Sequence, residues 1–241
     1  MGKYLSSKEI LNDQETKDKL NKWVSPSIRA GFPIQTVRKY FKGNGRVLDC
    51  GTASGEFLKI LYETGFSDVF AIDIDDYVSE KNRKFLKDLK LADLSYDKFP
   101  YEDNFFDLVT GWCIVPHLEN PYNFFREARR VLKPGGLLIV TLINIFTPSH
   151  RKYFYKHCDF PGFHDRNNHI ALFPKAVFKK TVLRDFDLIG KEYFISPSIF
   201  NRGLKAKVRR FVYNIASNSN RAKRFFDERW GAKVAMILRK K

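Results

Sequence analysis

The stretch "RVLDCGTASGEF" (residues 46–57) decides the fold of this chain. The apolar pair Val47-Leu48 runs into Asp49, and the small residues Gly51, Ala53 and Gly55 then alternate before an amphipathic segment begins. This pattern predicts a strand, a tight turn and a helix. Small side chains at alternate positions let a ligand approach the backbone closely. We therefore expect a binding site at this turn.

Two common phosphate-binding patterns do not fit this turn. A dinucleotide fingerprint, G-x-G-x-x-G, would place its third glycine at Glu56, where a carboxylate would face pyrophosphate. The G-x-x-x-x-G-K-[ST] pattern of nucleotide-binding P-loops is absent. The ligand at the turn is therefore of another kind.

The chain around the turn alternates between strand-like and helix-like segments. Apolar runs predict strands at 46–51, 68–74, 89–95, 106–113, 137–144, 186–196 and 231–240. Helical spacing predicts helices at 55–64, 76–88, 120–132 and 173–185, and "KPGG" (133–136) predicts a turn between helix and strand. Nearly all-apolar strands that alternate with helices predict a doubly wound, Rossmann-like α/β sheet of seven strands, mostly parallel, with helices on both faces. Asp107 is predicted to cap the edge of the fourth strand.

Four blocks of sequence together resemble the class I S-adenosylmethionine-dependent methyltransferases, in their small-molecule and glycan-modifying branch. The first is D-x-G-x-A-x-G (49–55), with Asp73 lying 24 residues after Asp49 at the end of "DVFAID". The others are "LADLSYDKFPYEDNFFDLV" (91–109), "HLENPYNFFREARRVLKPGGLLIVTLIN" (117–144) and "NHIALFPKAVFKKTVLRDFDLIGKEYF" (168–194). The resemblance implies that the last strand of the sheet is antiparallel.

The resemblance also implies a cofactor, S-adenosyl-L-methionine, and the residues that hold it. The amino-acid end of the cofactor would lie over the glycine turn, Asp73 would accept hydrogen bonds from both ribose hydroxyls, and Asp93 would take the adenine amino group. The full set of implied cofactor-binding residues is Asp49, Gly51, Ala53, Gly55, Asp73, Ile74, Asp93, Leu94, Trp112 and Cys113. No metal is expected. A valine at position 51 is expected to block cofactor binding and to leave the fold mostly intact.

Catalytic residues are less fixed by this pattern, because methyl transfer depends chiefly on alignment and exclusion of water. A general base helps when the acceptor is a hydroxyl, and His117 and His169 are the two candidates, with His150 and His164 as further histidines near the predicted pocket. The family commonly has Glu-His where this chain has Pro116-His117. A resemblance at position 117 therefore rests on the histidine alone.

The predicted organisation is one methyltransferase domain over residues 1–241. It comprises an N-terminal helical cap (1–44), a cofactor-binding core (45–144), an acceptor lid (145–169) and a C-terminal part (170–241) with a basic helical insertion (202–229). The lid is rich in aromatic, His and basic residues, and Arg151, Lys152, Lys156 and Arg166 suit an acceptor with phosphate or carboxylate.

The predicted function is methyl transfer to a small-molecule, glycan or lipid-linked acceptor. Two alternatives stay open: an RNA methyltransferase that uses its basic surface, and a cofactor-binding protein without transferase activity. Base methylation is disfavoured, because [DN]-P-P-[YF] is absent after the fourth strand and Cys113 follows Trp112 instead of proline.

Charge and cysteine content bear on location and partners. The net charge of +16 favours an anionic partner, and three cysteines without a metal-binding spacing are expected to be free thiols in a cytoplasmic protein. "MGKYLSSKEILNDQ" (1–14) has no apolar core, which predicts no signal peptide. Residues 202–229 carry nine Lys/Arg against two acidic residues, with apolar residues on one helical face. This segment either docks on an anionic surface, such as the inner face of a membrane, or packs its apolar face on the sheet.

Overall fold

The computed structural model describes residues 9, 13–22, 24–163, 168–201 and 204–241. Its centre is a seven-stranded sheet in the order β3-β2-β1-β4-β5-β7-β6. Strands β1 to β5 pair in parallel, whereas β7 is antiparallel to both of its neighbours, β5 and β6. The predicted Rossmann-like sheet with an antiparallel last strand is therefore confirmed.

The elements follow the predicted alternation closely. The strands are β1 (Val47–Cys50), β2 (Val69–Asp73), β3 (Asp88–Leu91), β4 (Phe106–Gly111), β5 (Leu132–Ile143), β6 (Phe186–Phe194) and β7 (Lys233–Lys240). The helices are α2 (Gln14–Lys22), α3 (Pro26–Arg29), α4 (Phe32–Tyr40), α5 (Glu56–Glu63), α6 (Glu80–Arg83), α7 (Pro121–Val131), α8 (Pro148–His157), α9 (Lys175–Thr181), α10 (Leu204–Ala216) and α11 (Asn220–Trp230), with 3-10 turns η1 (Val115–His117) and η2 (Pro197–Phe200).

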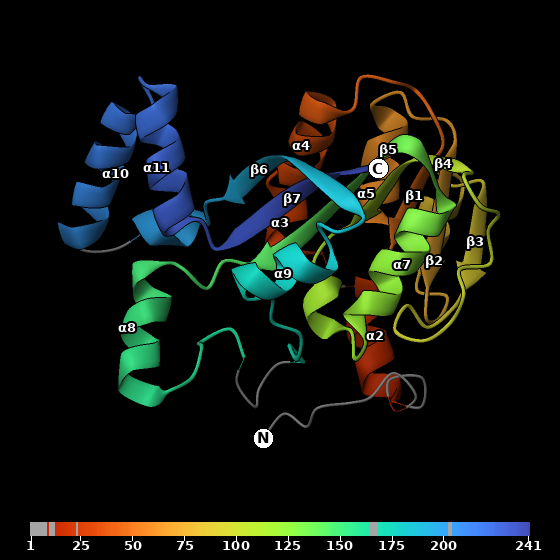
Figure 1. Cartoon of the computed structure of the whole chain (residues 1–241), viewed down its shortest axis with the longest axis horizontal. Helices are drawn as coiled ribbons and strands as arrows, with labels where there is room; N and C mark the ends of the chain where they lie inside the picture. Colours follow the sequence, from red (N-terminus) through yellow and green to blue (C-terminus); the bar gives the residue numbers. More distant parts are fainter. Residues whose placement is uncertain (1–8, 10–12, 23, 164–167, 202–203) are drawn as a thin grey trace.

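Helices cover both faces of the sheet and form two cores (Figure 1). On one face, α7 and α9 contribute Phe124, Phe125 and Phe178 to a cluster with Leu48 and Leu138. On the other face the main contributors are α4, through Val37, and α5, through residues 57–61. Burial on both sides explains why the central strands are almost continuously apolar.

The predicted "KPGG" turn is incorporated into β5 instead of preceding it. The register of β4 against β5 shifts between Phe106 and Leu108, so that residues 133–136 bulge from the ladder, and Gly135 adopts a φ of +76°. Asp107 holds this bulge: its carboxylate accepts hydrogen bonds from the backbone N–H of Arg46 (2.9 Å) and from Lys133 Nζ (2.7 Å). The predicted structural role of Asp107 is confirmed.

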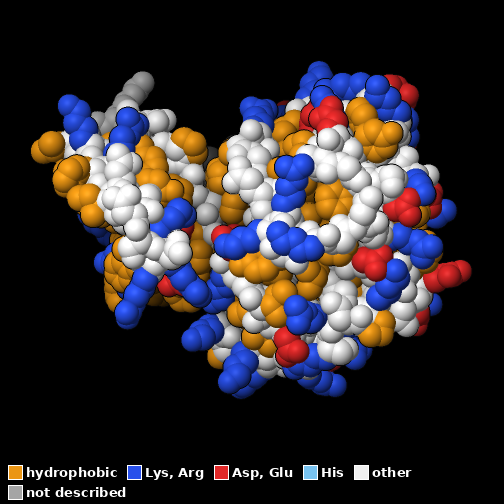
Figure 2. Space-filling model, turned by 90° about the horizontal axis from the view of Figure 1, so that it is seen from above, with side chains coloured by type: hydrophobic (Ala, Val, Ile, Leu, Met, Phe, Trp, Pro, Cys, Tyr) orange, Lys and Arg blue, Asp and Glu red, His pale blue; other side chains and the backbone are white. Residues whose placement is uncertain are grey.

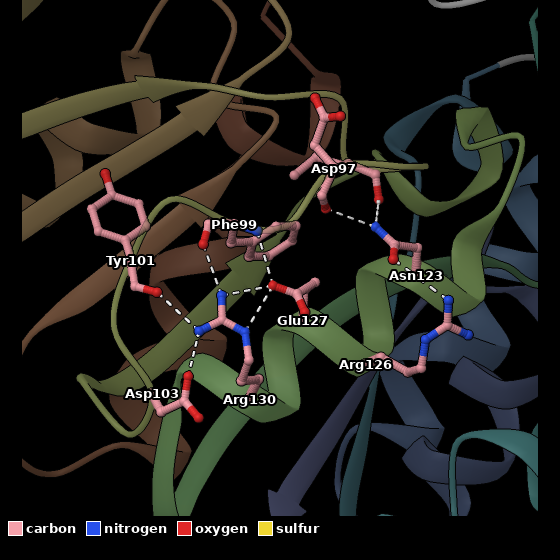
Figure 3. A network of polar contacts seen from close by, with 9 residues as sticks. Asp97, Phe99, Tyr101, Asp103, Asn123, Arg126, Glu127 and Arg130 are labelled. Carbon is pink, nitrogen blue, oxygen red and sulfur yellow. Dashed lines mark hydrogen bonds and ion pairs between the residues drawn. The ribbon is translucent and has the colours of Figure 1, made fainter.

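A polar network ties the β3–β4 connection to α7 (Figure 3). The Arg130 guanidinium donates to the carbonyls of Phe99 (2.7 Å) and Tyr101 (2.9 Å) and pairs with Asp103 and with Glu127. The same Glu127 carboxylate accepts the Phe99 N–H at 2.9 Å. A planar guanidinium that serves several acceptors at once fixes this otherwise irregular connection.

The predicted lid and the basic insertion are both helical. Residues 145–169 contain the exposed helix α8, and the candidates His164 and Arg166 lie outside the described residues. Helices α10 and α11 follow β6 and precede β7 in the sequence. They pack side by side at the end of the molecule that also carries α8 (Figure 1). The five large apolar side chains on the predicted face of α10, at positions 204, 208, 211, 212 and 215, are exposed, so the alternative in which this face packs on the sheet is wrong. Among the described residues, no helix has both the length and the apolarity needed to cross a bilayer.

Candidate cofactor and acceptor site

The glycine turn lies at the carboxyl edge of the parallel strands, between β1 and α5. Gly51 (φ +73°), Ala53 (φ +45°) and Gly55 (φ +78°) all adopt left-handed backbone conformations. The Gly51 N–H donates to the Ile72 carbonyl at 2.9 Å, which fixes the turn beside the end of β2. The turn therefore presents backbone atoms instead of side chains, as the sequence pattern predicts.

Asp73 connects the end of β2 to this turn. Its two carboxylate oxygens accept the backbone N–H groups of Ala53 and Ile74, each at 2.8 Å. Burial raises the pKa of Asp73 to about 6, although these two hydrogen bonds act in the opposite direction. Each carboxylate oxygen retains capacity for another donor, so Asp73 can also accept ribose hydroxyls.

Asp49 is the second buried carboxyl group at the turn. It accepts a hydrogen bond of 2.7 Å from Thr110 Oγ1, and burial raises its pKa to about 7. Asp49 thus links the end of β1 to β4 directly before the glycine turn begins.

A small cleft lies beside the turn. It is lined by Asp49, Gly51, Trp112 and others, and is covered by Val24 and Ile28 from the N-terminal segment. One buried polar atom in its wall, Trp112 Nε1, lacks a hydrogen-bond partner among the described residues. Unpaired buried groups of this kind are costly without a ligand. The free volume is about 20 Å³, so the cleft would have to widen to admit a nucleoside-sized cofactor.

Gly51 corrects one expectation from the sequence. A Cβ atom at this position would lie 2.8 Å from the Ile114 side chain, in a left-handed conformation that L-residues rarely adopt. A valine there would disturb the fold as well as the ligand, so the expected clean steric block is wrong.

Asp93 and Leu94 follow β3 at the same edge. The Asp93 carboxylate accepts the Ser95 N–H at 2.8 Å and so fixes the turn through residues 93–97. Leu94 is buried in the α7-side core. Contacts of both residues with an adenine ring stay predictions, as do the ligand contacts of the other implied residues.

Trp112 and Cys113 follow β4. The Trp112 ring packs edge-on against Phe57 and Phe32, with ring centroids 5.6 and 6.3 Å apart. Cys113, at φ +63°, places its thiol 2.8 Å from Lys233 Nζ at the start of β7. Burial opposes ionisation of the Cys113 thiol, but the charge and hydrogen bond of Lys233 outweigh it and hold the pKa below its ordinary value.

His117 and His169, 52 residues apart, pack against each other with ring centroids 4.6 Å apart. Backbone carbonyls hold this pair in place. The Pro116 carbonyl accepts the N–H groups of Ile170 and Ala171. His117 Nδ1 lies 2.9 Å from the Asn168 carbonyl oxygen, and His169 Nδ1 lies 2.6 Å from the Gly162 carbonyl oxygen. A carbonyl only accepts, so both Nδ1 atoms carry a proton, and in a neutral His117 ring the lone pair then lies on Nε2. Burial lowers the pKa of His117 to about 4, so this ring is neutral at neutral pH.

His150 is held elsewhere. Its Nδ1 lies 2.5 Å from Thr147 Oγ1, the residue that caps the start of α8. The structure therefore places His150 beside the N-cap of α8, and among the candidate histidines that the structure describes it brings together His117 and His169.

A cavity of about 520 Å³ lies at the carboxyl end of β5, on the α9 side of the sheet. Its wall is mostly apolar and includes Pro116, from the loop that also carries Cys113 and His117. Charged side chains surround it: Arg151, Lys175, Lys179, Lys191, Arg229 and Glu228. This composition fits an apolar molecule with an anionic group.

The sequence did not identify several residues of this edge. Lys233, Thr141 and Ser25 all contact Cys113, and Val24 and Ile28 cover the glycine turn. Lys233 could have been noticed, because it is a lone cation at the start of a buried strand. The other contacts depend on tertiary packing. Among the described residues, no three His, Cys, Asp or Glu side chains are arranged to hold a metal, and all three cysteines are unpaired thiols.

Comparison with known families gives one match. Residues 48–140 match the family described as "Methyltransferase domain". Among curated proteins, sarcosine/dimethylglycine N-methyltransferase of Halorhodospira halochloris is 30% identical over 101 residues, which cover 39% of this chain and 36% of the relative. The ubiquinone/menaquinone biosynthesis C-methyltransferase of Burkholderia mallei is 26% identical over 146 residues, which cover 56% of this chain and 59% of the relative. The chain thus spans less than two thirds of the length of these relatives.

Solved structures agree on the fold over nearly the whole chain. A methyltransferase dependent on S-adenosylmethionine from Archaeoglobus fulgidus superposes with a TM-score of 0.60 at 18% identity, covering 95% of this chain and all of that one. The complex of the Haloferax volcanii Trm112 methyltransferase activator with a methyltransferase gives a TM-score of 0.61 at 14% identity, covering 98% of this chain and 97% of that one.

Proposed function

We propose that the chain carries a class I S-adenosylmethionine-dependent methyltransferase domain and that the protein transfers a methyl group to an apolar small molecule that bears an anionic group. S-adenosyl-L-methionine is the cofactor of this domain class, and it supplies an electrophilic methyl group on a sulfonium centre. The observation that carries the proposed acceptor class is the cavity beside Pro116, with its apolar wall and surrounding cations.

The named relatives bracket two kinds of acceptor. One is named for sarcosine and dimethylglycine, which are small polar amino acids, and the other for ubiquinone and menaquinone biosynthesis. A cavity of about 520 Å³ with a mainly apolar lining is larger and less polar than an amino acid requires. The lining therefore supports the apolar kind of acceptor.

The residues of this chain would contribute mainly by alignment. The glycine turn and Asp73 would hold the cofactor, and the cavity would exclude water from the acceptor. Where the acceptor is a hydroxyl or an acidic carbon, Nε2 of His117 or His169 would take its proton. The backbone carbonyls that accept from both Nδ1 atoms fix the tautomer this role needs.

An RNA acceptor is the second candidate, favoured by the net charge of +16. It predicts methyl incorporation into RNA and an affinity that falls steeply as salt rises. Binding of the cofactor without transfer is the third candidate.

A labelled methyl donor separates these candidates. The purified chain is incubated with S-adenosylmethionine carrying a labelled methyl group and with matched acceptors: aromatic or long-chain carboxylates and phosphates, their neutral esters, sarcosine, and total RNA. The proposal predicts label in the apolar anions and at least tenfold less in the esters. Transfer confined to sarcosine or RNA, or no transfer to any acceptor, contradicts it.

A cavity-filling variant tests the location of the acceptor. Met236 lines the cavity, and Met236→Trp is expected to raise the acceptor KM at least tenfold while leaving S-adenosylhomocysteine affinity within about twofold. The control variant, Tyr62→Trp, introduces tryptophan at an exposed position of α5 that does not line the cavity. Equal KM values for both variants would place the acceptor elsewhere.

A further inference from the structure

Helix α10 presents an apolar stripe to solvent. Five large apolar side chains are between 46% and 77% exposed: Leu204, Val208, Phe211, Val212 and Ile215. At 100° per residue they fall within an arc of about 100°. The rest of the described chain does not cover them, although burial of such side chains is strongly favourable.

The opposite face of α10 explains why the stripe points outward. Ala206 and Ala216 are buried, and Tyr213 packs on Phe200 and Phe226 with centroids 5.5 and 5.1 Å apart. Arg209 donates to the Ile199 carbonyl at 2.9 Å and lies over the Trp230 ring. These contacts attach α10 to α11 and η2 and fix its rotation, so the stripe is a stable feature of the folded chain.

Cations border the stripe on both sides. At 100° per residue, Lys205 lies at one edge of the stripe and Lys207 at the other. Both side chains are exposed, and neither has an acidic partner among the described residues. The α10 sequence, LKAKVRRFVYNIA, contains four Lys/Arg and no acidic residue. Figure 2 shows the result: the α10–α11 pair forms a lobe set off from the body, where apolar side chains and Lys/Arg are interspersed.

The neighbouring helix α8 continues this character at the same end of the molecule (Figure 1). Its side chains Phe154 and Tyr155 are 42% and 86% exposed. The α8 sequence, PSHRKYFYKH, contains three Lys/Arg and no acidic residue.

We propose that the apolar stripe of α10 and its flanking lysines bind the surface of an anionic lipid bilayer. An amphipathic helix with large apolar residues on one side and Lys at the borders is the pattern of helices that lie in the lipid interface. The apolar side chains would enter the acyl boundary, and the cations would meet anionic headgroups. This inference does not depend on methyl transfer.

Other occupants fit the charge and the apolar surface less well. A nucleic acid would neutralise the lysines but leave the five apolar side chains against a hydrated phosphate backbone. A second copy of the chain would cover the apolar stripe but bring two helices with four cations each into contact.

Vesicle sedimentation with the full chain tests the proposal. The probes are vesicles of phosphatidylcholine alone and of equal parts phosphatidylglycerol and phosphatidylcholine. We expect sedimentation with the anionic vesicles only. Each lysine near an anionic surface contributes about fivefold to binding, so Lys205→Glu with Lys207→Glu is expected to weaken binding at least tenfold.

Two further variants separate insertion from simple charge attraction. Val208→Ser with Phe211→Ser removes two exposed apolar groups, keeps every charge, and is also expected to weaken binding at least tenfold. Lys84→Glu with Lys98→Glu, at exposed positions near β3, matches the charge change of the lysine variant and is expected to bind like the unmodified chain. Far-UV circular dichroism and the unfolding midpoint confirm that each variant is folded.

The outcomes divide as follows. Selective sedimentation with anionic vesicles that both α10 variants lose and the β3-side variant keeps supports the proposal. Absence of vesicle binding, binding that the serine variant retains, or loss in the β3-side variant overturns it. Salt-sensitive binding to RNA without vesicle binding, or a dimer that the serine variant dissociates, overturns it as well.

Discussion

Asp73 carries the clearest prediction at the scale of single residues. Ribose hydroxyls are expected to donate to its carboxylate, so binding of S-adenosylhomocysteine favours the ionised form. Because burial raises the pKa of Asp73 to about 6, affinity should rise about tenfold between pH 5 and pH 7.5 and then level off. Isothermal titration calorimetry across this range measures the effect.

The Asp73→Asn variant provides the matching test. It should bind about tenfold or more weakly at pH 7.5, because a charged acceptor is lost, and most of the pH dependence should vanish. Asp187→Asn, at the exposed edge strand β6, controls for the change in charge. An Asp73→Asn variant with unchanged affinity would mean that the ribose lies elsewhere.

His117 gives a second prediction at this scale. Burial lowers the pKa of His117 to about 4, so the ring is still an unprotonated base at pH 5. Titration of His117 should therefore cause no fall in kcat when the pH is lowered through 6.5. If it serves as the base, His117→Ala lowers kcat at least tenfold, whereas His150→Ala on α8 does not. Unchanged kcat in both His117→Ala and His169→Ala would indicate transfer by proximity without a side-chain base.

At the scale of elements, Arg130 is predicted to hold the β3–β4 connection on α7. Lysine keeps the charge but cannot serve Phe99 O, Tyr101 O and Glu127 together. Arg130→Lys should therefore lower the free energy of unfolding by about 2–3 kcal/mol. Arg126→Lys is the matched control on the same helix, because Arg126 makes one exposed contact of 3.5 Å with Asn123. Denaturant titration giving equal stabilities would contradict this role (Figure 3).

The elements also show what the sequence could predict. Strands and the turn 51–55 were predictable because periodicity and small residues act locally. The "KPGG" turn became a bulge because the pairing of Asp107 with Lys133 and Arg46 is a tertiary event. The helix of residues 148–157 was missed, since its side chains lack a buried face and hence a clear apolar period.

At the scale of the whole molecule, stability should depend on pH through the buried carboxyl groups. The folded pKa of Asp49, about 7, exceeds its ordinary value of 3.8. The contribution of Asp49 to the free energy of unfolding is therefore fully present below pH 4 and is lost as the pH rises through 7. Asp49→Asn removes this dependence, so the variant should gain stability relative to the unmodified chain between pH 4 and pH 7. A stability difference that is constant with pH, measured by denaturant titration, would contradict the buried, raised-pKa assignment.

Long-range arrangement limits what a single sequence shows about the site. The doubly wound sheet with its antiparallel last strand, and the places of Asp49 and Asp73 at the strand ends, followed from four blocks of sequence. The pairing of His117 with His169, the contact of Lys233 with Cys113 and the cover over the glycine turn join segments far apart in the chain. The exposure of the α10 stripe also required the structure, since the same pattern fits a helix packed on the sheet.

The most direct test of a cofactor site at the glycine turn is calorimetric titration of the purified chain with S-adenosylhomocysteine at pH 7.5. We expect saturable binding at one site per chain, competition by S-adenosylmethionine, and a matching rise in the unfolding midpoint. A folded chain that shows neither heat nor a shift of the midpoint at millimolar ligand would contradict this expectation.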